Sequence, residues 1–178
     1  ILYDLATTAD GTNELTDIFG KKDIFENPKP TDLIKFFIQY AAGSDATILD
    51  FFAGSGTTGQ AVLSLNKEDG GNRKFILCTN NENNICTDIC YPRVKKVIGG
   101  YKNAKGIKVD ALGGSLRYYV SDFVEAEPTD RNKRKLVNES TDMLCIKEGA
   151  FELIKDGTEF KIFKGGNKHL GIVFYEDA

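Results

Sequence analysis

The chain has 178 residues, of which 41% are hydrophobic and 28% are charged, and its formal net charge is −3. This composition is typical of a globular protein, and the mild charge provides no global attraction for nucleic acid or for an anionic membrane. No apolar run approaches the roughly 20 residues that span a bilayer. The four cysteines lack the spacing of zinc ligands, so we expect reduced thiols in a cytoplasmic protein with no metal and no membrane association.

The first part of the chain contains few apolar residues and leads into a proline-rich segment. We expect residues 1–24 to be a connecting segment with a short helix over 13–19. Pro28 and Pro30 fix their own φ angles and hold the preceding residues extended, so residues 25–30 should form a stiff loop. The chain begins without an initiator methionine, and we therefore expect a piece of a longer protein.

A helix is predicted directly after this loop. Thr31 stands where an N-cap is favoured, and apolar residues recur at helical spacing from Leu33 to Ala41. The pattern predicts an amphipathic helix over 31–42 whose apolar face is buried. Gly43 should end this helix, because glycine readily adopts the left-handed conformation found at helix ends.

Two apolar runs then flank a second helical segment. Residues 46–52 are mainly apolar and contain one acid, Asp50, which is typical of a central parallel strand covered on both faces. Helical spacing follows over 57–66, and a second strand-like run covers 74–79. A strand, a helix and a strand of these lengths predict a βαβ unit and hence an α/β fold.

The next part of the chain mixes loops with one helix and one strand. Residues 80–84 should form a polar loop. Residues 87–98 predict a helix in which Pro92 either lies early or breaks the pattern. Residues 99–106 should form a second loop, and residues 116–124 predict a third strand.

The C-terminal part predicts a small α+β appendage. Asp130 should cap a charged helix over 131–143. Three strand-like runs separated by glycine-containing turns then predict an antiparallel meander. The runs are 150–154, 160–163 and 171–175, and the turns are Asp156–Gly157 and Gly165–Gly166.

The segment between the first strand and its helix is rich in glycine. Gly54, Gly56 and Gly59 fit the pattern GxGxxG, which lets a backbone bend sharply and approach a ligand. The simplest alternative is a turn with no ligand. A P-loop is excluded, because Gln60 stands where lysine is needed. A dinucleotide site is disfavoured but stays open, because Thr79-Asn80-Asn81 stands where the ribose-binding acid is expected.

S-adenosylmethionine is the third candidate ligand of this turn. The amino acid end of S-adenosylmethionine carries a carboxylate and an ammonium group. A helix N-terminus suits the carboxylate, and an acid such as Asp50 suits the ammonium group, directly or through water.

The same residues resemble motifs of a known family. Residues 50–59, Asp-Phe-Phe-Ala-Gly-Ser-Gly-Thr-Thr-Gly, closely resemble motif I of the DNA amino-methyltransferases, which methylate N6 of adenine or N4 of cytosine. Residues 27–30, Asn-Pro-Lys-Pro, resemble motif X of that family, and their position shortly before motif I is that of the β group. Further segments resemble the modification subunit of type III restriction-modification systems, namely 11–20, 72–82, 116–119 and 141–148.

The resemblance implies a fold, a cofactor and the residues that bind it. The fold is a partial Rossmann-like S-adenosylmethionine-dependent methyltransferase fold with a small α+β C-terminal appendage. The chain then divides into a connecting segment 1–24, a cofactor-binding part 25–124 and part of a C-terminal domain 125–178. The residues implied to bind S-adenosylmethionine are Asn27, Pro28, Lys29, Pro30, Asp50, Phe51, Phe52, Ala53, Gly54, Ser55, Gly56, Thr57, Thr58 and Asn81.

Two expected features of the family are missing from the sequence. The catalytic motif, Asp/Asn/Ser-Pro-Pro followed by an aromatic residue, needs two adjacent prolines, and the four prolines of this chain are all separated. We therefore expect no catalytic residue here and no methyl transfer by the isolated chain. The acid after the second strand is also absent, which leaves the amide of Asn81 or the carboxylate of Glu82 as the group for the ribose.

For the complete enzyme, the resemblance implies a site-specific DNA adenine-N6 methyltransferase of a restriction-modification system. The target base is flipped out of the duplex and receives a methyl group from S-adenosylmethionine. The implied partners are double-stranded DNA, bound mainly by other parts of the enzyme, a second copy of the subunit and a restriction subunit. Two alternatives stay open: an NAD-type dinucleotide-binding domain, and a non-catalytic dimerisation or assembly module.

Several of these residues have a structural alternative to a ligand role. Lys29 either meets the cofactor carboxylate or is a solvated lysine between two prolines. Ser55, Thr57 and Thr58 either donate to the cofactor or cap the helix, with Thr57 as the expected N-cap. Asp122 either contacts the adenine ring of the cofactor or is a surface acid.

Overall fold

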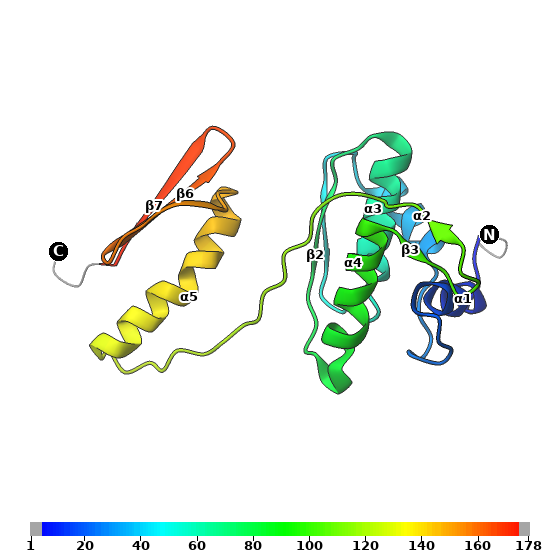
Figure 1. The fold of residues 1–178 in the computed structure, drawn as a ribbon, viewed down its shortest axis with the longest axis horizontal. Coiled ribbons are helices and arrows are strands. Elements are labelled where there is room, and N and C mark those ends of the chain that lie inside the picture. The colour runs from blue at the N-terminus through cyan, green and yellow to red at the C-terminus, as the bar shows by residue number, and fades with distance from the viewer. Residues whose placement is uncertain (1–4, 175–178) are drawn as a thin grey trace. The chain divides into compact units, whose positions relative to one another are not determined.

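The computed structural model describes residues 5–174, which form two compact units that adjoin in the sequence at Tyr118 and Tyr119 (Figure 1). The first unit mixes helices and strands, and the second unit joins one helix to a three-stranded sheet. None of the helices in residues 5–174 combines the length and the apolar character that crossing a membrane requires.

The first unit contains the predicted βαβ unit. Strand β1 (Thr47–Asp50) pairs in parallel with β2 (Lys74–Leu77), and helix α3 (Thr57–Asp69) connects them. The other elements of this unit are α1 (Thr8–Phe19), α2 (Thr31–Ala41), a 3₁₀ turn (Glu82–Asn84), a π-helical turn (Ile85–Cys90), α4 (Tyr91–Gly99), and the hairpin strands β3 (Tyr101–Lys102) and β4 (Lys108–Val109).

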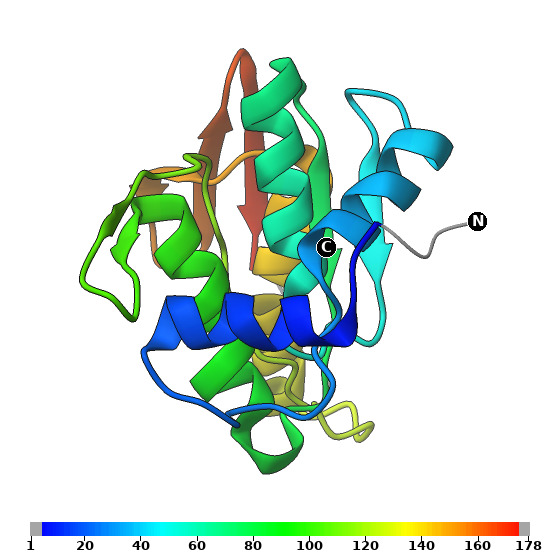
Figure 2. The ribbon, with the colours of Figure 1, turned by 90° about the vertical axis from the view of Figure 1, so that its right-hand side faces the viewer.

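Helix α3 holds the first unit together, because it is buried on two sides. Leu65 belongs to a core cluster with Ile38 of α2. Leu63 belongs to a second cluster with Ile18 of α1 and Val94 of α4. Figure 2 accordingly shows α2 and α4 on opposite sides of α3. The start of α3, which follows the glycine-rich turn, is thus set by packing along the rest of the helix.

Helix α1 is longer than the predicted helix over 13–19, because its first turn is capped. The N–H of Thr7 donates to Asp10 Oδ2 (2.6 Å), and the N–H of Asp10 donates to Thr7 Oγ1 (3.4 Å). This capping box satisfies donors that the first turn of a helix leaves without intrahelical partners. Leu15 and Ile18 are buried, so α1 is part of the core rather than only a connection.

Helix α2 begins and packs differently from the prediction. Its N-cap is Pro30, and Thr31 is its first residue rather than its cap. The N–H of Thr31 donates to the carboxylate of Glu14 (2.9 Å), which replaces the predicted cap. On the predicted apolar face Ile38 is buried, but Phe37 remains 49% exposed. The helix therefore packs through a narrower stripe than its sequence pattern indicates.

The sheet of β1 and β2 is covered on one face only, so the prediction of a strand covered on both faces is wrong. Ile48 and Phe75 pack against the core under α3. Leu49 and Ile76, which pair with each other, are each 48% exposed. Successive side chains of a strand point to opposite faces, and α3 covers only one of them.

The predicted third strand over 116–124 is absent, because these residues pair with no strand in the described part of the chain. A strand needs a neighbouring edge to satisfy its backbone groups, whatever its side-chain pattern. Val120 and Phe123 accordingly remain 74% and 89% exposed. The predicted loop over 99–106 contains the short strand β3, which forms a hairpin with β4 just beyond the loop.

The second unit contains the predicted antiparallel meander. Its elements are α5 (Asp130–Glu148) and the strands β5 (Glu152–Asp156), β6 (Phe160–Gly165) and β7 (Lys168–Val173), paired in that order. The last predicted strand residue, Tyr175, lies outside the described residues. The N-cap of α5 is Thr129 rather than Asp130, since Thr129 Oγ1 accepts from the N–H of Asn132 (3.2 Å).

Candidate functional site

The glycine-rich turn lies at the carboxyl ends of β1 and β2. The N–H of Ala53 donates to the carbonyl of Cys78 (3.1 Å), just beyond β2, and the N–H of Gly56 donates to the carbonyl of Ala53 (2.7 Å). Gly54 and Gly56 have φ angles of 51° and 81°, in the left-handed region that favours glycine. Hydrogen bonds therefore hold the backbone of the turn at its start and at its end.

Residues 25–30, the proline loop, lie against this turn. Thr57 Oγ1 donates to the carbonyl oxygen of Lys29 (3.1 Å), although the two residues are 28 positions apart in the sequence. A Cβ atom on Gly54 would lie 3.6 Å from the ring of Phe25. Pro28 is buried, whereas the side chain of Lys29 is exposed. The fold thus brings together the two segments that resemble motifs X and I.

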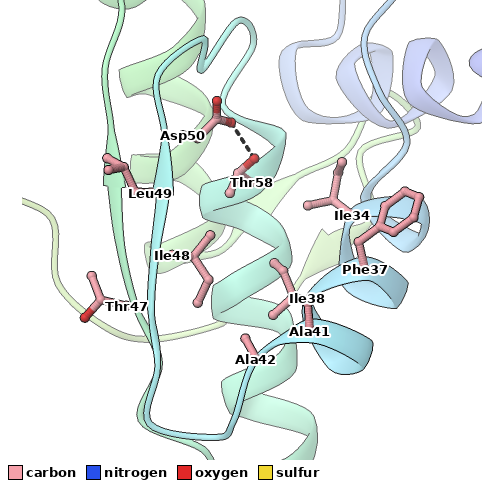
Figure 3. Close-up of a pocket in the computed structure, with 10 residues that line it drawn as sticks. All are labelled: Ile34, Phe37, Ile38, Ala41, Ala42, Thr47, Ile48, Leu49, Asp50 and Thr58. Atoms are coloured by element: carbon pink, nitrogen blue, oxygen red, sulfur yellow. Dashed lines mark hydrogen bonds between the residues drawn. The ribbon is translucent and has the colours of Figure 1, made fainter.

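Asp50 ends β1 with its carboxylate held in place. Thr58 Oγ1 donates to Asp50 Oδ2 (2.6 Å), and the N–H of Phe52 donates to Asp50 Oδ1 (3.0 Å). Figure 3 shows the Asp50 and Thr58 side chains pointing toward each other. An ionised carboxylate has about four acceptor positions, so these two bonds leave capacity for a cationic ligand group.

A hollow of ≈ 370 Å³ lies between α2, β1 and α3, beside this carboxylate. Its floor is apolar, and Asp50 and Thr58 provide polar groups at one end (Figure 3). The lining residues are Ile34, Phe37, Ile38, Ala41, Ala42, Thr47, Ile48, Leu49, Asp50 and Thr58. Of the residues predicted to bind the cofactor, only Asp50 and Thr58 line this hollow.

A buried arginine, which the sequence patterns did not indicate, lies beneath the turn. Arg93 of α4 is 0% exposed, and its Nη1 donates to Ser55 Oγ (3.0 Å) and Thr57 Oγ1 (2.8 Å). Its Nη2 donates to Glu14 Oε2 (3.0 Å). Burial lowers the pKa of Arg93 to about 10, and the Glu14 carboxylate opposes this shift, so the guanidinium is charged at neutral pH. No local pattern marks Arg93, because these partners lie 36 to 79 positions away.

The hydroxyl groups of Ser55 and Thr57 point into the protein, toward Arg93. The N-cap of α3 is Gly56, which has no side chain, so the predicted N-cap role of Thr57 is wrong. No side chain within residues 5–174 caps α3, and the first N–H groups of a helix have no intrahelical acceptors. The start of α3 therefore offers backbone donors and partial positive charge.

Cys90 lies directly under Gly56 and restricts what can stand there. A Cβ atom on Gly56 would lie 3.1 Å from both the carbonyl oxygen and the Sγ atom of Cys90. Burial raises the pKa of the Cys90 thiol to about 12, so this thiol is protonated at neutral pH and acts as a packing group. Among the residues that the structure describes, no cluster of three or more His, Cys, Asp or Glu side chains could hold a metal ion.

Three other residues predicted to bind the cofactor have side chains that hold a neighbouring turn or lie at the surface. Asn81 has a left-handed φ angle of 55°, and its Oδ1 accepts from the N–H groups of Cys86 (2.9 Å) and Thr87 (3.1 Å), so its side chain holds the start of the π-helical turn. Phe51 and Phe52 are 65% and 93% exposed. They directly follow Asp50 in the sequence, and their side chains lie at the surface.

Two further residues for which cofactor contacts were considered lie on the surface. Asn27 has a φ angle of 52° and is exposed within the proline loop. Asp122 is exposed and forms an ion pair with Lys135 (2.9 Å) within the second unit. The Lys135 ammonium group and the N–H of Phe123 lower the pKa of Asp122.

A DNA methylase family model, N6_N4_Mtase, matches residues 6–110. This range contains the proline loop, the glycine-rich turn and Arg93. The chain therefore belongs to this family of DNA methylases, and its mixed helix and strand content fits the α/β fold of a methyltransferase.

Restriction-modification enzymes are among its curated relatives. The chain is 53% identical over 75 residues to the Mod subunit of the type III enzyme StyLTI from Salmonella typhimurium, which covers 42% of this chain and 11% of the relative. It is 43% identical over 115 residues to the type II methyltransferase M.KpnI from Klebsiella pneumoniae, and the match covers 65% of this chain and 25% of the relative. It is 45% identical over 76 residues to the EcoPI Mod subunit from Escherichia phage P1, and the match covers 43% of this chain and 12% of the relative. The matches thus span about a tenth to a quarter of these relatives.

Proposed function

We propose that this chain is the cofactor-binding part of a site-specific DNA adenine-N6 methyltransferase, with a partial Rossmann-like fold, and that it binds S-adenosylmethionine at the carboxyl ends of β1 and β2. The observation that carries the proposal is the hydrogen bond from Thr57 to the carbonyl of Lys29, which joins the segments of motifs X and I. The family match over residues 6–110 supports a methyl donor as the ligand of this junction.

The groups around the turn fit the amino acid end of that cofactor. Asp50 retains acceptor positions for the ammonium group, and the uncapped start of α3 offers N–H donors and partial positive charge to the carboxylate. Asn81 uses its Oδ1 to hold the π-helical turn, and its Nδ2 makes no hydrogen bond within the described residues, so Nδ2 is the donor for a ribose hydroxyl. The bound cofactor supplies the methyl group, and these residues orient it.

The larger enzyme is proposed from the relatives. The relatives named as type III Mod subunits support a modification subunit of a restriction-modification enzyme. The same proposal has this subunit act on double-stranded DNA, pair with a second copy and join a restriction subunit. We assign cofactor binding to residues 25–124, and we assign residues 125–178 to a C-terminal domain of that subunit. Residues 1–24 then lead into the cofactor-binding part and contribute α1 to its core.

We expect the purified chain to bind S-adenosylmethionine in preference to NAD in a calorimetric titration. Asp50→Asn should weaken S-adenosylmethionine binding about tenfold, because it removes the charge that faces the ammonium group. Asp45→Asn is the matched control, since Asp45 is an exposed acid at the opposite end of β1, and its affinity should equal that of the wild type. Tighter binding of NAD, or equal affinity of the Asp50 and Asp45 variants, would contradict the proposed site.

We also expect the isolated chain to transfer no methyl group to DNA, because its sequence contains no adjacent prolines for the Pro-Pro-aromatic motif. The measurement is the incorporation of labelled methyl groups from S-adenosylmethionine into duplex DNA, with an active adenine-N6 methyltransferase as the positive control. Incorporation by the wild-type chain that disappears in the Gly56→Ala variant would show that this expectation is wrong.

A further inference from the structure

Arg93 joins α4 to three other segments of the first unit beneath the glycine-rich turn. Its partners lie in α1, at the start of α2, and in residues 55–60, which form the end of the turn and the start of α3. Its Nε donates to Gln60 of α3 (2.8 Å), its Nη1 to two hydroxyls of the turn and the start of α3, and its Nη2 to α1 and the start of α2. The acceptors are Gln60, Ser55, Thr57, Glu14 and Thr31.

The guanidinium of Arg93 has all of its donors engaged. An arginine side chain has five N–H donors in a planar fork, and the structure provides five acceptors at 2.8 to 3.2 Å. A lysine ammonium has three donors and cannot reproduce a planar fork of this width. The directions of the Ser55 and Thr57 hydroxyls therefore depend on a guanidinium at this position.

The positive charge of Arg93 is paired with the carboxylate of Glu14. Arg93 is 0% exposed, and Glu14 is the carboxylate in contact with it. A buried charge is costly unless it is paired and hydrogen-bonded. The Glu14 carboxylate also accepts hydrogen bonds from the N–H (2.9 Å) and the hydroxyl group of Thr31. The ion pair thus connects α1 to the residue that directly follows the proline loop.

These contacts reach both segments of the proposed cofactor site. Thr57 accepts from Arg93 and donates to the carbonyl of Lys29, so one chain of hydrogen bonds runs from Arg93 through Thr57 to the proline loop. The hydroxyls of Ser55 and Thr57 are therefore used inside the protein, in contacts with Arg93.

We propose that Arg93 is a positioning residue of the cofactor site, with Glu14 as its counter-ion, and that it holds the glycine-rich turn and the proline loop in the geometry that receives the cofactor. This inference rests on the proposed function for the identity of the ligand. The hydrogen bonds that hold the turn are observed independently of any ligand.

The test compares Arg93→Lys with Arg73→Lys. Arg73 is a matched control, because it is also a buried arginine paired with one acid, Asp69, but it lies at the opposite end of β2. Arg93→Lys should weaken S-adenosylmethionine binding about tenfold or more, since small displacements of positioning groups have large effects. Arg73→Lys should leave the affinity unchanged within about twofold. Both variants keep the charge, so an intact fold is expected of each.

Hydrogen exchange provides a readout that does not depend on the ligand. In Arg93→Lys the amides of Ala53 and Gly56 should exchange about tenfold faster than in the wild type, because the turn loses its support. The amide of Lys74, which donates to Ala46 at the far end of the sheet, should keep its wild-type rate. In Arg73→Lys the amides of Ala53 and Gly56 should stay protected.

The two readouts separate the possible failures. If the wild-type chain binds S-adenosylmethionine and Arg93→Lys binds it equally well, Arg93 is not a positioning residue. If the wild-type chain does not bind S-adenosylmethionine, the proposed function fails, and the exchange rates of Ala53 and Gly56 still decide whether Arg93 holds the turn. If Arg73→Lys loosens the turn as much as Arg93→Lys does, the effect is general instability, and the proposal is overturned.

Discussion

Gly11→Ala should lower the free energy of unfolding of the first unit by about 2 kcal/mol. Gly11 lies within α1, where alanine normally favours the helix by about 1 kcal/mol. Here a Cβ atom would overlap the carbonyl oxygen of Pro28 and lie 2.9 Å from its carbonyl carbon. Both are backbone atoms of the proline loop, so the loop must move. Cofactor binding should weaken together with stability, because Lys29 and its contact with Thr57 move as well.

Gly99→Ala is the matched control for Gly11→Ala. Gly99 is also a helical glycine, at the end of α4, and a Cβ atom there would meet nothing within 4 Å. The measurement is urea denaturation read by hydrogen exchange, in which peptides from residues 119–174 serve as an internal reference. Gly99→Ala should be neutral or slightly stabilising. A Gly11→Ala protein as stable as Gly99→Ala would show that the contact between α1 and the proline loop is not tight.

Gly56→Ala should have the largest effect on the turn, lowering the free energy of unfolding by about 3 kcal/mol. Two costs combine at this position. The φ angle of 81° is unfavourable for any residue with a Cβ atom, and that atom would lie 3.1 Å from two atoms of Cys90. Because Gly56 is the N-cap of α3, the strain falls on the N–H groups proposed to receive the cofactor carboxylate.

Gly70→Ala is the control that separates the effect of the left-handed φ angle from the effect of the contact with Cys90. Gly70 is the C-cap of the same helix, has a similar φ angle of 71°, and would place its Cβ atom in open space. This control should therefore lose about 1 kcal/mol from the left-handed conformation alone, and it should bind S-adenosylmethionine like the wild type. Equal losses in the two variants would mean that the contact with Cys90 contributes nothing.

Elements with partners close in the sequence were predicted well. The βαβ unit and the C-terminal meander are each closed by short connections, so the local period of the side chains and the positions of glycine largely determine them. Helix ends were predicted less well. The N-caps at Gly56 and Pro30 differ from the expected Thr57 and Thr31, because both threonine side chains bind distant groups instead.

Predictions that depended on distant neighbours were wrong. Residues 116–124 have the pattern of a strand, but no edge in the described chain pairs with them. Leu49 and Ile76 have the apolar character of core residues, yet the face they share lies open. A side-chain pattern records which residues tolerate burial, whereas burial itself requires another element to be present.

The class of protein and the position of the glycine-rich turn follow from residues 50–59, because Asp50 and the glycines lie in one short segment and their spacing is tied to one conformation. How that turn is held, in contrast, depends on residues that are distant in the sequence. Arg93, Glu14 and Thr57 are separated by 36 to 79 positions and meet because α1, α3 and α4 share a core. Long-range hydrogen bonds have no sequence spacing of their own, so they become visible only when the helices are packed.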